Sequence, residues 1–234
     1  MNTYNIKARV YPLIITLIPI VFVGIIYSFQ LKSIYELLIS LGITTSLFFL
    51  FSQIGRDKGK NLENELWKKW NGTPSTQILR FTNDTLDHHT KKRYHDFLKK
   101  KTEIGQELTE LFENENLIEA DSIYTSWSKY LISKSRDTSK YNLLFQENIN
   151  YGFRRNLLGL KPIALTIIFL LLIGSFGYSY FISNFELIYS QELLFTGIVL
   201  FLSLLFWLLI VNEKWIKYVA FEYAKRLMET IDKE

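Results

Sequence analysis

The chain has 234 residues, a formal net charge of +4 and no cysteine. The lack of cysteine excludes disulfides, a thiolate nucleophile and a cysteine-ligated metal, and so small a net charge does not indicate a nucleic-acid partner. About half of the residues are apolar (48%), which is ordinary for a globular protein, so the information lies in how they are distributed.

Four stretches contain no charged residue: 10–31, 37–55, 162–185 and 193–212. A helix rises about 1.5 Å per residue, so about 20 residues cross a hydrocarbon core of about 30 Å. The alternative is a large water-soluble core, but core helices of soluble proteins keep a polar stripe, and the first stretch has none. The sequence therefore predicts an all-α membrane protein with two transmembrane helical hairpins flanking a helical cytosolic domain.

The distribution of Lys and Arg predicts which side each part faces. The predicted parts are a first hairpin in 1–54 (spans at 10–29 and 35–54), a cytosolic domain in 55–161, a second hairpin in 162–212 (spans at 162–184 and 192–212) and an amphipathic cytosolic helix in 213–234. Basic residues gather at the span ends that lead to the termini and to the middle domain. In the two predicted hairpin turns, Lys32 is the one basic residue. We therefore expect both termini and the middle domain in the cytosol, so a signal must arrive from the cytosol, the membrane or a partner.

The predicted spans carry no ionisable residue well inside the membrane, which argues against a pump or an ion-coupled transporter. The second span instead has a face of hydroxyls that includes Ser40, Thr44 and Thr45. Small and hydroxyl side chains serve helix–helix packing. The alternative interpretation of this face is that it lines a pore in an oligomer.

The middle domain shows helical patterns at 57–70, 85–100, 118–134 and 139–158, and the last of these runs into the third span. Asn71-Gly72 predicts the end of the first helix, and Thr73-Pro74 predicts an N-cap followed by proline at the first helical position. The tail beyond residue 212 has one apolar face, which we expect to pack on the middle domain, on a neighbouring subunit or on the membrane surface.

Charge is segregated along the middle domain. A basic run at 91–93 and 99–101 precedes seven acidic residues between 103 and 121 that have no base among them. Such runs most often face each other or solvent, and we expect that here.

No motif for catalysis or for a cofactor is present. His88, His89 and His95 lack the spacing of three or four residues that lets two helical side chains bind one metal ion. Phosphate-binding, dinucleotide-binding and nucleophile-elbow glycine motifs are absent. We therefore expect no enzyme, no metal site and no cofactor.

Polar side chains gather on both sides of the predicted cytosolic membrane boundary. Arg56 and Asp57 follow the second span, and a second set precedes the third span. That set consists of Glu147, Asn148, Tyr151, Arg154 and Arg155. Arg–carboxylate contacts between the two sets would pair the hairpins. The cluster is either a structural ion pair or a ligand site or gate that couples the domain to the spans, with Gly152 and Gly159 as hinges.

Two motifs resemble those of a family of uncharacterised bacterial four-span inner-membrane proteins. They are Gly-Arg-Asp-Lys-Gly-Lys at 55–60 and Glu-Asn-Ile-Asn-Tyr-Gly-Phe-Arg-Arg-Asn-Leu-Leu-Gly-Leu-Lys-Pro at 147–162. The layout is also loosely similar to small membrane effectors of anti-phage systems. The resemblance implies a bacterial inner membrane and a family-specific role for the cytosolic domain.

The leading functional hypothesis is an oligomeric inner-membrane protein that perturbs the lipid bilayer, or conducts across it, when its cytosolic domain receives a signal. The alternative is a non-catalytic membrane anchor or scaffold that recruits a cytosolic partner protein. We expect a homo-oligomer in the first case.

Overall fold

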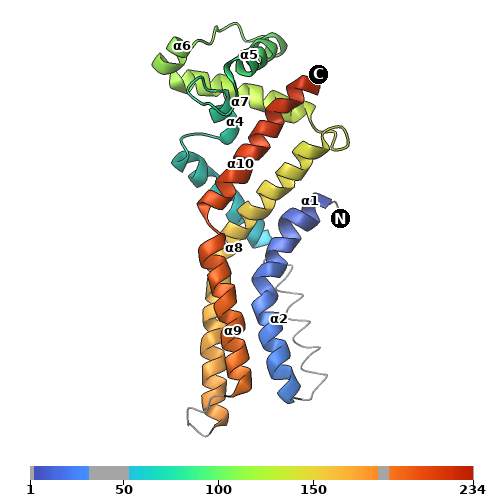
Figure 1. The fold of residues 1–234 in the computed structure, drawn as a ribbon, viewed down its shortest axis with the longest axis vertical. Coiled ribbons are helices and arrows are strands. Elements are labelled where there is room, and N and C mark those ends of the chain that lie inside the picture. The colour runs from blue at the N-terminus through green and yellow to red at the C-terminus, as the bar shows by residue number, and fades with distance from the viewer. Residues whose placement is uncertain (1–2, 32–52, 184–189, 234) are drawn as a thin grey trace. The chain divides into compact units, whose positions relative to one another are not determined.

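The computed structural model describes residues 3–31, 53–183 and 190–233, and its regular elements in these ranges are all helical (Figure 1). The chain divides into two compact units. Unit 1 comprises Met1–Glu63 and Gly152–Trp215, and unit 2 comprises Asn64–Tyr151 and Ile216–Glu234. The prediction of an all-helical chain is confirmed for the described residues.

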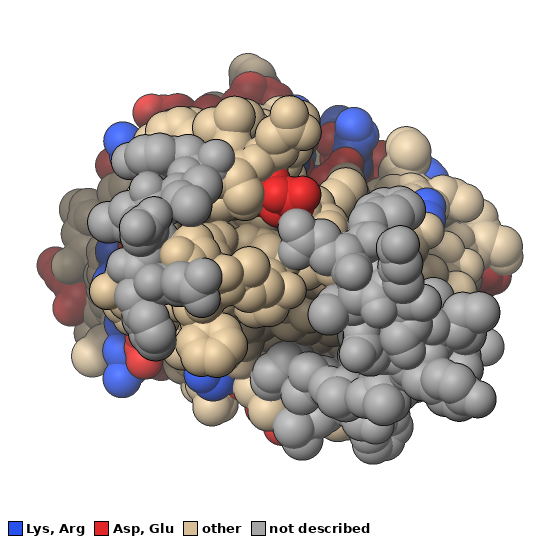
Figure 2. Space-filling view, turned by 90° about the horizontal axis from the view of Figure 1, so that it is seen from below, with Lys and Arg blue, Asp and Glu red and all other residues tan. Residues whose placement is uncertain are grey.

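Three helices are long and apolar enough to span a membrane. Within the described residues they are Thr3–Tyr27, Asn142–Ile182 and Gln191–Ile210, and they cover all but the last two residues of the first, third and fourth predicted spans. The second predicted span, with Ser40, Thr44 and Thr45, lies outside the described residues. Seen from below, most of the described surface is uncharged, with an acidic side chain near the middle of the view (Figure 2).

Unit 1 contains these helices and the start of a further one. Its elements are α1 (Thr3–Asn5), η1 (Ile6–Val10), α2 (Tyr11–Leu31), the first part of a helix at 53–69, most of α8 (Asn142–Ile182), α9 (Gln191–Leu205) and η2 (Phe206–Ile210). Helix α2 packs against α9. A core of buried apolar residues joins α2, α8 and the α9–η2 segment, with Val23, Leu160 and Trp207 among its members.

Unit 2 has a core of its own, built from short helices. Its elements are α4 (Pro74–Leu79), α5 (His88–Thr102), α6 (Glu110–Glu115), α7 (Leu117–Lys134), the first turns of α8, α10 (Glu213–Met228) and η3 (Glu229–Lys233). Tyr94, Tyr124 and Trp127 are its largest fully buried side chains. Helix α6 is an element that the sequence patterns did not predict.

Local signals set several of these boundaries. The helix at 53–69 ends where Asn71 and Gly72 take positive φ angles of 63° and 126°, which glycine adopts without strain. The Thr73 hydroxyl then accepts the backbone N–H of Thr76 and Pro74 begins α4, so the predicted N-cap is confirmed. The helix expected at 139–158 runs into the third span as predicted, because the two form one helix, α8, of 41 residues that begins at Asn142.

The amphipathic tail folds onto unit 2. Ala224, Leu227 and Met228 of α10 and Ile231 of η3 belong to the same buried cluster as Tyr94 and Trp127. Of the three places expected for the tail, packing on the middle domain is therefore the one found.

Candidate functional site

The predicted polar cluster is divided between the two units. Arg56, Asp57, Arg154 and Arg155 belong to unit 1, whereas Glu147, Asn148 and Tyr151 belong to unit 2. Arg56 and Asp57 are exposed.

In unit 2, two of these residues have contacts that stay within the unit. Tyr151 is buried and stacks on Tyr223 of α10, with ring centroids 6.4 Å apart. The amide of Asn150 donates to Glu147 at 3.4 Å, which is a long contact near the surface. Tyr151 thus serves packing of the tail.

In unit 1, Arg155 pairs with Glu63 rather than with Asp57. Its guanidinium donates to the Glu63 carboxylate at 3.0 Å, and both side chains are only 14% exposed. Arg–carboxylate contact between the helix at 53–69 and α8 was the predicted geometry, and a carboxylate six residues further along supplies it. The sequence contained this signal, since Glu63 lies on the same helix as Asp57.

Three more polar side chains of α8 reach backbone carbonyls of other segments. Arg154 donates to Trp215 at 2.8 Å and its guanidinium lies 4.5 Å from the indole centroid. Asn156 donates to Ala8 at 2.7 Å, and Lys161 donates to Val211 at 2.7 Å. Together with Arg155, these side chains form what we call the α8 junction: Arg154, Arg155, Asn156 and Lys161.

Two of the carbonyls that the junction binds, those of Ala8 and Val211, lie in or next to π-helical turns. Ala8 lies inside the π-helical turn η1, and Val211 directly follows the π-helical turn η2. A π-helical turn shifts the hydrogen-bond ladder by one residue and leaves carbonyls without a helical donor. Asn156 and Lys161 donate to the two carbonyls at these turns.

Glycines bring the helix at 53–69 into backbone contact with α8. A Cβ built on Gly159 would lie 2.7 Å from the backbone nitrogen of Gly59. Gly55 and Gly59 have the small-xxx-small spacing that lets helices approach closely, and Gly55 meets Leu160. The space that a Cβ on Gly152 would take is likewise occupied by the side chains of Tyr4 and Ala8. The two glycines predicted as hinges thus lie at close contacts within a continuous helix.

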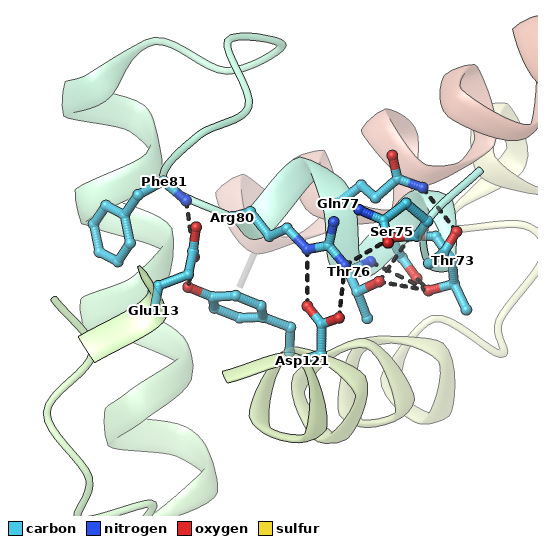
Figure 3. A network of polar contacts seen from close by, with 11 residues as sticks. Thr73, Ser75, Thr76, Gln77, Arg80, Phe81, Glu113 and Asp121 are labelled. Carbon is cyan, nitrogen blue, oxygen red and sulfur yellow. Dashed lines mark hydrogen bonds and ion pairs between the residues drawn. The ribbon is translucent and has the colours of Figure 1, made fainter. Parts of the chain in front are cut away.

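Unit 2 holds a second polar site, which we call the α4 network: Arg80, Lys91, His95, Glu113 and Asp121. Figure 3 shows Arg80, Glu113 and Asp121 of this network. The Arg80 guanidinium, just after α4, binds both carboxylate oxygens of Asp121 on α7 at 2.9 and 2.6 Å. It also donates to the carbonyl of Asn71 at 2.8 Å. The bidentate geometry fixes α4 against α7, and the hydrogen bond to Asp121 raises the pKa of Arg80.

Glu113 on α6 is the buried carboxylate of the α4 network. Its side chain is 1% exposed and accepts the Phe81 backbone N–H at 3.0 Å and the Tyr124 hydroxyl at 2.7 Å. Burial, followed by the bond to Glu113, raises the pKa of Tyr124. One acidic residue of the 103–121 run therefore faces the protein interior.

Lys91 corrects the expectation that the basic run faces solvent or the acidic run. It is 4% exposed, and its ammonium donates to the carbonyls of Arg80 at 2.8 Å, of Phe81 at 3.3 Å and of Asn83. Burial lowers its pKa. The ammonium closes the turn that follows α4. This burial could not be predicted from the sequence, because Lys91 is next to exposed basic residues.

His95 completes the α4 network. Its Nε2 lies 2.8 Å from the carbonyl of Leu79, and since a carbonyl only accepts, Nε2 carries the proton. The ring packs against Phe81, Tyr124 and Trp127. Burial lowers the pKa of His95, so the ring is neutral at neutral pH.

The polar side chains of the α8 junction and the α4 network bind other groups of the protein. In the described ranges 3–31, 53–183 and 190–233, no group of three or more His, Asp or Glu side chains is placed to hold a metal ion. The cations of the α4 network are buried and already bonded to protein groups, which is the arrangement of a structural network.

Comparison with known proteins finds no match to the chain among family models, curated proteins or solved structures. The resemblance of 55–60 and 147–162 to a family of bacterial inner-membrane proteins stays a prediction.

Proposed function

We propose that this chain is a non-catalytic bacterial inner-membrane protein that self-associates and perturbs the bilayer, or conducts across it, when unit 2 receives a cytosolic signal. The observation that carries the proposal is α8. This one helix begins among the residues of unit 2, and its later turns contain the α8 junction and an apolar segment of spanning length.

The α8 junction supports the coupling role of α8. Its side chains bind segments at 6–10, 53–69 and 211–215, so a displacement of α8 changes bonds to every one of them. Packed helix interfaces tend to switch between discrete arrangements and do not deform gradually. We place the coupling residues in the junction, with Arg155 and its partner Glu63 at its centre.

The proposal is tested by forced clustering in place of the unknown signal. A drug-induced dimerisation domain is fused after residue 234, and membrane potential is followed in cells with a voltage-sensitive dye. We expect depolarisation when the drug is added. A variant in which Arg154→Ala and Arg155→Ala are combined should insert normally and respond at least about tenfold less, while Arg136→Ala, an exposed arginine of unit 2, serves as the control. An unchanged response of the double variant would remove the coupling role.

One observation favours the second candidate, a membrane anchor that recruits a cytosolic partner protein. The hydroxyls of Thr16, Thr166, Ser175 and Ser203 each donate to a carbonyl four residues earlier in their own helix, which leaves them as helix-internal groups rather than pore-lining ones. The pore face predicted from the sequence, at Ser40, Thr44 and Thr45, lies outside the described residues. Clustered protein that leaves the membrane potential unchanged, yet retains one stoichiometric soluble protein through purification, would establish the anchor instead.

A further inference from the structure

The corner between α6 and α7 exposes apolar side chains and has exposed acids next to them in the sequence. Leu111 is 74% exposed and Ile118 is 90% exposed, and Leu117 between them is 40% exposed. Single exposed apolar residues are ordinary, but a concentration of them inside a polar rim marks an interaction site. The exposed acids of this corner are Glu110, Glu115 and Glu119. We call these six residues the acidic corner.

The exposed carboxylates of the acidic corner determine which kind of partner surface can bind there. Anionic lipid headgroups repel them, so the membrane surface is a poor occupant. A basic surface with apolar stems fits, because long lysine side chains cover apolar groups while their ammonium ions meet carboxylates at the rim.

The chain itself has exposed lysines on α5, which lie at different positions around the helix. Lys92, Lys100 and Lys101 are exposed on this helix, where Asp96 is the exposed acid. The Lys101 ammonium lies 5.6 Å from the centroid of the Phe97 ring, so an aromatic face lies beside the cations. In unit 2, α5 and α6 are separate helices that each pack against α7 (Figure 1).

We propose that the acidic corner of one copy docks on the α5 lysines of a second copy. The inference deepens the proposed function by naming the surface through which self-association occurs, and it rests on that function. The two surfaces differ, so the contact is head-to-tail. Contacts of this type build rings or open filaments instead of two-fold dimers, and a ring is the assembly that a membrane-perturbing oligomer needs.

Charge reversal tests the pairing on the full-length protein in nanodiscs and in detergent, with mass photometry as the readout. The corner variant carries Glu110→Lys, Glu115→Lys and Glu119→Lys, and the α5 variant carries Lys92→Glu, Lys100→Glu and Lys101→Glu. Each variant alone should associate at least about tenfold more weakly than the parent, since like charges then meet. Mixed one to one, the two variants should associate again, because each corner then meets an α5 surface of opposite charge.

The apolar part of the corner has a matched control. Ile118→Ser should weaken association several-fold, whereas Ile132→Ser, an exposed isoleucine (46%) on the same helix, should leave it unchanged. Parent association should also weaken between 50 and 500 mM salt, as expected for exposed charges.

The outcomes separate this inference from the proposed function. A parent protein that stays monomeric at every concentration overturns both. A parent oligomer that survives both charge reversals overturns only the docking surface. Variants that lose association alone and do not regain it when mixed also overturn the pairing.

Discussion

Lys91 and Lys92 are neighbours in one basic run, yet only one of them is part of the fold. Lys91 binds three carbonyls of the turn after α4, whereas Lys92 is exposed. Lys91→Met keeps the length of the side chain but leaves buried carbonyls without a donor. We expect it to lower the free energy of unfolding by about 2–3 kcal/mol, measured by chemical denaturation in detergent. Lys92→Met is the control and should change stability by less than about 0.5 kcal/mol; equal effects would contradict the structural role.

His95 gives the fold a dependence on pH. Burial holds its folded pKa below the ordinary value, so the unfolded chain binds the proton more readily. Stability is then fully present above a pH of about 6.5 and falls as the pH drops from there through the folded pKa. Lys91, Glu113 and Asp96 are the charged groups that act on the ring besides burial.

The prediction for His95 is a loss of thermal stability between pH 7.5 and pH 5.5, followed by tryptophan fluorescence since Trp127 lies 5.2 Å from the ring. His95→Gln can still donate to the Leu79 carbonyl and does not titrate, so it should lose less over the same range. His88→Gln, an exposed histidine at the start of the same helix, should behave like the parent. Identical pH profiles for all three proteins would show that another group controls this range.

At the scale of elements, glycine spacing decides how closely the helix at 53–69 and α8 approach. A methyl group at Gly159 meets backbone atoms of Gly59 at 2.7 and 3.0 Å, and backbone cannot move aside as a flexible side chain does. Gly159→Ala should therefore destabilise unit 1 by about 1–3 kcal/mol through overpacking. Gly177→Ala is the matched control on α8, because among the described residues a methyl group there meets nothing within 4 Å. Thermal inactivation or protease resistance in detergent would measure both, and equal stability of the two variants would contradict close backbone contact.

Helix periodicity and caps predicted the elements better than the sites. The Thr73 cap, the stop at Asn71-Gly72 and α7 could be predicted because each depends on residues next to one another in the sequence. The Glu63–Arg155 pair joins residues 92 positions apart, and the carbonyls bound by Asn156 and Lys161 become acceptors through π-helical turns that periodicity does not reveal. Lys91 is the clearest case, since its burial follows from tertiary packing of a helix with few apolar residues.

For the whole molecule, the number of spans determines on which side of the membrane each part lies. The distribution of Lys and Arg predicts both termini and unit 2 on one side, which requires the segment at 35–54 to cross. Since the chain has no cysteine, single cysteines report position without further changes. We choose Thr3→Cys, Lys134→Cys, Gln191→Cys and Lys233→Cys, which replace exposed residues.

With four spans, a membrane-impermeant maleimide added to spheroplasts should label only the cysteine at 191, and the other three only after the membrane is opened. With three spans, positions 3 and 134 would lie on opposite sides, and the cysteine at 3 or at 134 would react in intact spheroplasts. The second result would also remove the face at Ser40, Thr44 and Thr45 from the membrane and with it the pore. Four spans keep a conducting oligomer and a cytosolic unit 2, and docking of the acidic corner on α5 then takes place on the side where a cytosolic signal arrives.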